Sequence, residues 1–177
     1  DTYRHSIASK CIEMGVCIVN DISGGQFDPK IIKIAGNHKV PYVLTFNEIN
    51  SLKSNNKNKF ESIIQNALFY FSKKIKKAYK SGLNDIIIDP GFGFGKTIEN
   101  DYFIMKKLEL FKSLDLPILV GVSRKSMIYK KLKINPEKAL NGTTVINSVA
   151  LLKGANILRV HDVCEAKECI DLLQALQ

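Results

Sequence analysis

Short apolar runs, rich in β-branched residues, recur along the chain and alternate with longer stretches of helical periodicity. Five such runs occupy residues 17–21, 41–45, 85–89, 117–121 and 157–161. Continuous apolar runs of this length are typical of strands that are buried on both faces, as in parallel sheets. Strands that alternate with helices therefore predict an α/β fold built on a parallel sheet.

Six stretches carry the helical pattern: residues 3–14, 29–36, 59–80, 100–112, 136–153 and 164–175. Gly15, Gly82 and Gly154 each follow one of these stretches, where a left-handed residue commonly ends a helix. Asp28 and Pro29 supply an N-cap residue and a proline for the first helical position. The residues that begin and end helices thus agree with the helical periodicity.

Composition indicates one ordinary globular domain over residues 1–177, with 45% hydrophobic and 24% charged residues. Residues 47–58 are rich in Asn, Ser and Lys and predict a surface loop, either covering a substrate or merely tolerated. No apolar run approaches the roughly 20 residues that a membrane span needs, and the first residues do not form a signal peptide. We expect a cytoplasmic protein without a membrane partner.

The net charge of +9 raises the question of nucleic-acid binding. The lysines are dispersed among Asn, Ile and acidic residues, so a solvated basic surface is favoured over a nucleic-acid partner, and part of the charge is available to anionic substrates. The four cysteines, at positions 11, 17, 164 and 169, lack a C-x-x-C or Cys/His metal spacing. They predict reduced thiols rather than a metal site.

Ligands bind at the carboxyl ends of strands in parallel α/β folds, so these ends are the places to seek chemistry. Asp89 ends the third run and is followed by a glycine-rich loop, residues 91–95, and then Lys96 and Thr97. The loop is one residue short of G-x-x-x-x-G-K-S/T, and Lys96 replaces the third glycine of G-x-G-x-x-G. We favour a loop that lets backbone and phenylalanines approach a flat ligand over a phosphate-binding loop.

Asp89 and Asn20 are candidates for binding such a ring. A carboxylate at a strand end accepts two parallel hydrogen bonds from a guanidine-like edge, which pterins possess, and Asn20 offers a donor and an acceptor to the same ring. The alternative for Asn20 and Asp21 is turn chemistry before Ser23.

Two further strand ends carry basic residues. Arg159 and His161 are two residues apart on a predicted strand, so both side chains can meet one anion; the alternative is an ion pair with Asp162 or Glu165. Lys125 follows the fourth run and can reach a bound ring. Ser126 is expected at the start of the next helix, where N–H groups favour a carboxylate, although a solvated turn explains these residues equally well.

Taken together, these strings resemble the dihydropteroate synthase family in order and spacing across almost the whole chain. The matching strings lie at residues 1–2, 20–25, 89–96, 123–127, 141–144 and 159–163. The resemblance implies a (β/α)₈ TIM barrel of which about five strands are present, the N-terminal strands being absent. It implies condensation of 6-hydroxymethyl-7,8-dihydropterin diphosphate with 4-aminobenzoate to give 7,8-dihydropteroate and diphosphate in folate biosynthesis. Mg²⁺ as cofactor, a homodimer and competition by sulfonamides are further implications.

The resemblance also assigns residues. The implied catalytic group consists of Lys125, Asp89, Arg159 and His161. The pterin would be held by Asp1, Asn20, Ile22, Asp89 and Lys125, the diphosphate by Arg159 and His161, and 4-aminobenzoate by Phe94, Lys125 and Ser126. The family's Asn metal ligand would lie upstream, so no metal ligand is expected in this chain.

This sequence departs from the family pattern at two positions. Thr45 stands where the family has a methionine after a strand, and Ala139, beside Lys138, stands where an arginine is common. Two alternative functions remain open at this point: an inactive truncated fragment, whose unpaired sheet edges would reduce its stability, and a methyltetrahydrofolate-binding methyltransferase domain. The Ser-Arg-Lys-Ser and Arg-x-His strings disfavour the methyltransferase, because a methyl donor has no diphosphate to bind.

Overall fold

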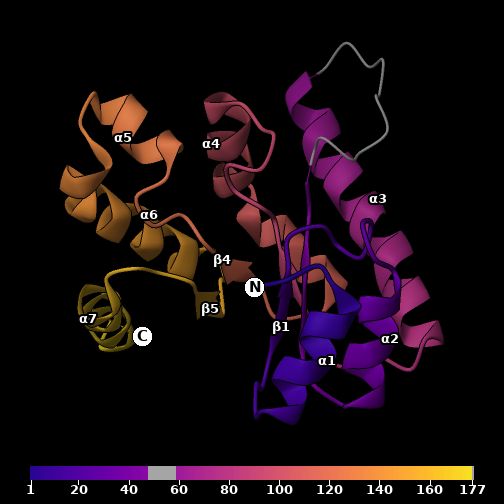
Figure 1. Cartoon of the computed structure of the whole chain (residues 1–177). Helices are drawn as coiled ribbons and strands as arrows, with labels where there is room; N and C mark the ends of the chain where they lie inside the picture. Colours follow the sequence, from indigo (N-terminus) through magenta and orange to yellow (C-terminus); the bar gives the residue numbers. More distant parts are fainter. Residues whose placement is uncertain (48–58, 177) are drawn as a thin grey trace.

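The computed structural model describes residues 1–47 and 59–176, so most of the predicted loop at residues 47–58 lies outside the described residues (Figure 1). Each predicted apolar run contains a strand, and all paired strands are parallel, which confirms the α/β class. The strands are shorter than the runs, because each run includes residues that lead into or out of the ladder. Their bounds are Val19–Asp21 (β1), Tyr42–Thr45 (β2), Ile86–Asp89 (β3), Leu119–Val120 (β4) and Ile157–Leu158 (β5).

The strands lie side by side in chain order. β1, β2 and β3 form one ladder, and β4 and β5 form a second. A parallel bridge between Ile88 and Ile118 joins the two, and the Ile88 N–H donates to the Pro117 carbonyl at 2.9 Å. The carboxyl ends of all the strands therefore face one side of the molecule, as the sequence predicts.

The described part of the chain contains seven α-helices and two 3₁₀ helices, of which α1 precedes the first strand and α7 follows the last (Figure 1). They are α1 (His5–Glu13), α2 (Lys30–Asn37), α3 (Lys59–Lys80), α4 (Ile98–Lys106), η2 (Leu108–Leu114), α5 (Ser126–Leu132), η3 (Pro136–Lys138), α6 (Leu140–Leu152) and α7 (Val163–Gln174). Gly15, Gly82 and Gly154 follow helices with φ of +98°, +82° and +100°, which confirms the predicted helix ends.

Two predicted helices are corrected in detail. The stretch at residues 100–112 is divided into α4 and η2, and α4 begins earlier, where the Thr97 hydroxyl accepts from the Asn100 N–H at 3.2 Å. The stretch at residues 136–153 is divided into η3 and α6. In both cases a tight 3₁₀ turn adjoins the α-helix, which a 3.6-residue period alone does not reveal.

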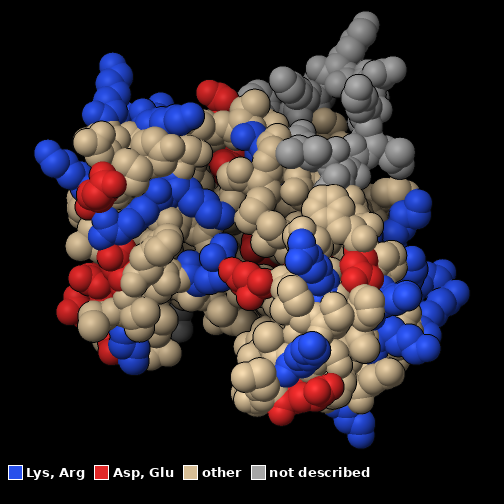
Figure 2. Space-filling model, in the orientation of Figure 1, with Lys and Arg blue, Asp and Glu red and all other residues tan. Residues whose placement is uncertain are grey.

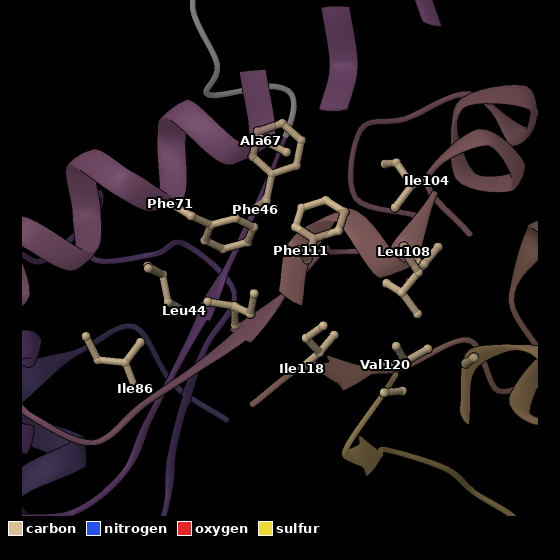
Figure 3. Packing of buried hydrophobic residues seen from close by; sticks show 14 of the residues in the cluster. Leu44, Phe46, Ala67, Phe71, Ile86, Ile104, Leu108, Phe111, Ile118 and Val120 are labelled. Atoms are coloured by element: carbon tan, nitrogen blue, oxygen red, sulfur yellow. The ribbon is translucent and has the colours of Figure 1, made fainter. Parts of the chain in front are cut away.

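The main core lies between the sheet and the helices packed on it (Figure 3). Phe71 of α3 contacts Phe46, which follows β2, and Phe111 of η2, with ring centroids 6.2 and 6.0 Å apart. All three rings are fully buried, as are Leu44 and Val120. Aromatic packing of this kind supplies much of the apolar area that holds helices on a sheet.

A second, smaller apolar cluster lies among the strands themselves and comprises Val43, Ile87, Leu119 and Ile157. Val43 alternates with Leu44, which belongs to the main core, so the two clusters lie on opposite faces of the sheet. β2, β3 and β4 are therefore buried on both faces, in agreement with their continuous apolar runs, whereas both residues of β5 are half-buried.

Basic and acidic side chains alternate over the face of the molecule shown in Figure 2, in agreement with the dispersed lysines of the sequence. The four cysteines carry free thiols, with Cys169 buried in α7 and Cys17 and Cys164 exposed. Among the described residues, no helix is long and apolar enough to cross a membrane.

Candidate active site

The strand register places several candidate residues on one face of the sheet. Asn20 pairs with Val43, which pairs with Ile87, and Thr45 pairs with Asp89 one pleat further along. Residues paired across parallel strands point to the same face, and alternate residues along a strand do so too. Asn20, Thr45 and Asp89 therefore share the face of the smaller apolar cluster, toward the carboxyl ends of the strands.

Arg159, which follows β5, joins this face. Leu119 pairs with Ile157, and Gly121 and Arg159 each come two residues later. A Cβ on Gly121 would lie 3.0 Å from an Nη atom of Arg159, so the absence of a side chain gives the guanidinium room to lie against the strand end. The Arg159 Nε is buried and has no hydrogen-bond partner within the described residues.

Asp89 is the buried anionic centre of the site. Its side chain is 3% exposed, and its Oδ1 accepts from the Gly91 N–H at 2.7 Å. Burial raises the pKa of Asp89, whereas the Gly91 N–H and the positive charges of Lys125, Arg159 and Lys96 oppose that rise. The positive charges of three different loops thus act on one buried carboxylate.

Lys125 lies beside Phe94, the candidate for binding 4-aminobenzoate. Its Nζ donates to the Phe92 carbonyl at 2.5 Å and lies 4.7 Å from the centroid of the Phe94 ring. Burial lowers the pKa of Lys125, and the Asp89 charge opposes the change. Ser126, the next residue, is the first residue of α5.

The glycine-rich loop is held by hydrogen bonds from the side chain of Lys96 and to the side chain of Asp101. The Lys96 ammonium donates to the carbonyls of Gly91 at 2.6 Å, Phe46 at 3.2 Å and Phe94 at 3.3 Å. The Asp101 carboxylate accepts from the Gly93 N–H at 3.0 and 3.1 Å. Lys96 is therefore engaged with backbone carbonyls, which disfavours the alternative of a phosphate-binding loop.

Asn20 and Asp1 meet at a pocket of about 290 Å³. The Asn20 amide Nδ2 donates to the Asp1 carboxylate at 2.5 Å, while the Asn20 Oδ1 is buried without a partner in the described part of the chain. Ile22, 39% exposed, forms part of the same wall. The pocket is lined by Asp1, Thr2, Tyr3, Arg4, Ile7, Asn20 and Ile22.

Three of the five predicted ring-binding residues therefore line one pocket, Asp1, Asn20 and Ile22. The other two, Asp89 and Lys125, do not line it. Asn20 and Asp89 lie on strands separated by β2 alone, which corresponds to about 10 Å across the sheet.

The predicted pair of Arg159 and His161 is placed beyond the last strand, because β5 ends at Leu158 rather than at residue 161. His161 nevertheless remains tied to the β4 loop, since its N–H and its Nδ1 lie 3.3 and 3.0 Å from the Ser123 hydroxyl. The alternative ion pair with Asp162 is not formed by either residue in the described structure. Asp162 is paired with Arg124 instead.

Buried polar atoms without a partner gather at the strand ends. Five such side-chain atoms occur among the described residues, and four belong to Asn20, Ser23, Thr45 and Arg159. Buried polar groups are nearly always paired in folded proteins, so a concentration of unpaired ones at one end of a sheet indicates a place where a polar ligand is bound. Sequence reasoning missed Ser23, whose only signal is its position after Asn20 and Asp21.

A family model described as "Pterin binding enzyme" matches residues 1–161 of the chain. The chain belongs to the pterin binding enzyme family. It is 34% identical to the dihydropteroate synthase of Bacillus subtilis over 99% of its own length and 60% of that relative. The chain thus spans about 60% of the length of that curated relative.

Solved structures of family members have the same fold. A dihydropteroate synthase from Clostridium difficile, determined in the presence of pteroic acid, superposes with a TM-score of 0.91 at 31% identity, covering 99% of this chain and 65% of that one. The enzyme from Thermus thermophilus in complex with 6HMPPP superposes with a TM-score of 0.90 at 26% identity, covering 100% and 69%. The resemblance stated from the sequence is confirmed at the level of the family.

Proposed function

We propose that this chain provides the substrate-binding part of a dihydropteroate synthase. The reaction joins 6-hydroxymethyl-7,8-dihydropterin diphosphate to 4-aminobenzoate, giving 7,8-dihydropteroate and diphosphate. The observation that carries the proposal is the buried Asp89 carboxylate at the carboxyl ends of parallel strands, with Arg159 on the same face of the sheet and the Lys125 ammonium over the Phe94 ring of the following loop. The names of the related proteins and of two bound complexes among them agree with this interpretation.

The five parallel strands represent, in this proposal, part of a (β/α)₈ barrel, with residues 1–177 as one pterin-binding domain. Two features support it. The strands follow one another in chain order and are covered by helices, and the cluster of Val43, Ile87, Leu119 and Ile157 occupies the face that would be the barrel interior.

The pterin ring would be recognised by groups from three strand ends. Asp89 is the anchor, because a buried carboxylate accepts two N–H groups of the guanidine-like ring edge in a low-dielectric setting where such bonds are strong. The unpaired Asn20 Oδ1 would accept a further ring N–H, and the exposed Ile22 would pack on the ring face. Asp1 would hold Asn20 in place through their hydrogen bond.

The diphosphate and the second substrate would bind on either side of Lys125. Arg159, with its unpaired Nε, and His161 would bind the diphosphate. Phe94 and Ser126 would form the aminobenzoate pocket with Lys125, which already lies over the Phe94 ring. Sulfonamides would compete at that pocket.

The chemistry needs no covalent bond to the protein. The aromatic amine attacks the methylene carbon of the pterin, a C–N bond forms, the C–O bond to the diphosphate breaks, and the amine loses a proton. Arg159 and His161 would stabilise the charge that develops on the departing diphosphate, which is the electrostatic contribution that enzymes most often make. Asp89, Lys125 and the ring-binding residues would hold the two reactants in line.

Mg²⁺ remains a prediction. Among the described residues, no group of three or more His, Cys, Asp or Glu side chains is arranged to hold a metal ion. We assign no step of the reaction to it.

A homodimer is also proposed for the family fold. Several large apolar residues of α6 and α7 are more than half exposed, as expected of helices that pack against another subunit. They are Val145, Leu152, Val163 and Leu172. Sedimentation velocity of the chain would test the proposal.

Calorimetric titration with 6-hydroxymethyl-7,8-dihydropterin diphosphate tests the proposed function. We expect saturable binding that weakens at least about 100-fold in Asp89→Ala, because a charge-assisted bidentate contact of roughly 3 kcal/mol is removed. Asp85→Ala is the matched control, since Asp85 is an exposed carboxylate at the opposite end of the same strand. A folded chain that binds nothing, or equal binding in both variants, would contradict the proposal and favour the inactive-fragment alternative.

A further inference from the structure

Arg124 is an extensively bonded basic side chain near the site, although sequence reasoning assigned it no separate role. Its Nε and Nη2 donate to the two carboxylate oxygens of Asp162 at 2.9 and 2.8 Å. Its Nη1 donates to the carbonyls of Glu137 at 2.6 Å and Pro136 at 3.2 Å. All three guanidinium nitrogens are therefore engaged within the protein, so Arg124 has little capacity left for a ligand.

The backbone of Arg124 is held in an unusual conformation. Its φ is +53°, in the left-handed region, which costs a residue with a side chain roughly 1 kcal/mol. Its N–H donates to the Thr143 hydroxyl at 3.0 Å, and this contact fixes the turn that separates Ser123 from Lys125. A strained residue that persists next to a binding site points to a functional requirement on its position.

Asp162 occupies a sensitive place. It follows His161 directly and is three residues from Arg159, the two residues assigned to the diphosphate. Hydrogen bonds from Arg124 keep the pKa of Asp162 below its ordinary value, so the group stays ionised. An ionised carboxylate that was free to turn would compete with an anionic ligand for Arg159 and His161.

We propose that Arg124 is a positioning residue that sequesters the Asp162 carboxylate, so that Arg159 and His161 remain available to the diphosphate. The planar fork of arginine suits this role because it binds both carboxylate oxygens at once and fixes their direction. The Ser123 hydroxyl, next to Arg124 in the chain, contacts His161 and so helps to keep His161 apart from Asp162. The inference rests on the proposed diphosphate site.

Calorimetric titration of the 177-residue chain with inorganic pyrophosphate at low salt tests the proposal. In Arg124→Met, we expect affinity to fall about tenfold, because the released Asp162 pairs with His161 or Arg159. Asp162→Asn should keep affinity within about twofold of wild type, and Arg124→Met/Asp162→Asn should recover to within about threefold. Arg124→Lys retains one donor for Asp162 and should lose about threefold, also recovered by Asp162→Asn, which serves if Arg124→Met does not fold.

Lys153→Met is the matched control, since it removes one positive charge and breaks an exposed pair with Glu109. If Lys153→Met and Arg124→Met bind pyrophosphate with equal affinity, the loss is explained by the change in net charge alone, and the proposal is overturned. The proposal would also be overturned if Arg124→Met/Asp162→Asn bound pyrophosphate as weakly as Arg124→Met, because the loss of affinity would then not come from Asp162. Binding that is unchanged in Arg159→Ala would instead overturn the diphosphate site itself, and the role of Arg124 with it.

Discussion

The hydroxyl of Tyr42 donates to the Asp21 carboxylate at 2.6 Å, and both side chains are almost completely buried. Burial, followed by the Asp21 charge, raises the pKa of Tyr42 far above its ordinary value, so the hydroxyl remains a donor at any working pH. Asp21 also accepts from the N–H groups of Ser23 and Gly25 at 2.8 Å each. The contact therefore helps to fix the loop that carries Ile22 into the pocket.

Tyr42→Phe removes this hydrogen bond and keeps the ring, so the apolar packing is unchanged. Because the acceptor is charged and buried, we expect a loss of about 2 kcal/mol in the free energy of unfolding, against about 1 kcal/mol for a neutral bond. Tyr102→Phe is the matched control, since its hydroxyl donates to the neutral Met127 carbonyl at 2.9 Å. The melting temperature should fall by roughly 4–8 °C in the first variant and 2–4 °C in the second.

Urea unfolding followed by circular dichroism measures both free energies, provided that the slope with denaturant is the same in the two variants. A loss in Tyr42→Phe no larger than that in Tyr102→Phe would refute the reasoning, because it would mean that Asp21 does not depend on the phenolic donor.

Three further predictions concern the strand ends. Asp89→Asn should be more stable than wild type above about pH 4. Burial raises the pKa of Asp89, so the wild-type protein loses stability as pH rises from the pKa of this group in the unfolded state to its pKa in the folded state, whereas the variant does not. Equal dependence of the melting temperature on pH in the two proteins would contradict this. Gly91→Ala should lower the free energy of unfolding by at least about 3 kcal/mol, because φ is +70° and the new Cβ would lie 2.0 Å from the Phe46 carbonyl oxygen. Gly15→Ala is the control: at φ +98° and in open space, it should lower the free energy of unfolding by about 1 kcal/mol in the same urea titration. Thr45→Val should raise stability by about 1 kcal/mol, because the Thr45 hydroxyl is buried without a partner among the described residues, and a lower melting temperature would show that it is paired.

The sequence alone determined the class of fold and the places where chemistry is expected. Apolar runs and helical periods report which faces are buried, and burial is the main term in folding, so the strands and most helices follow from local pattern. The sequence places Asn20, Asp89, Lys125 and Arg159 as candidates at one edge of the sheet, because parallel strands bring their carboxyl ends together. Helix ends were found because left-handed glycines follow them.

Only the tertiary structure decided which groups meet. Arg124 and Asp162 are 38 residues apart, and Lys96 reaches the Phe46 carbonyl across 50 residues, so no local pattern contains these contacts. The register that places Thr45 beside Asp89 likewise depends on how two strands align, and a shift of one residue would turn each side chain to the other face. Residue types can be identified along the chain, whereas pairing between distant charges is settled by packing, because it depends on the distances and orientations that the fold imposes.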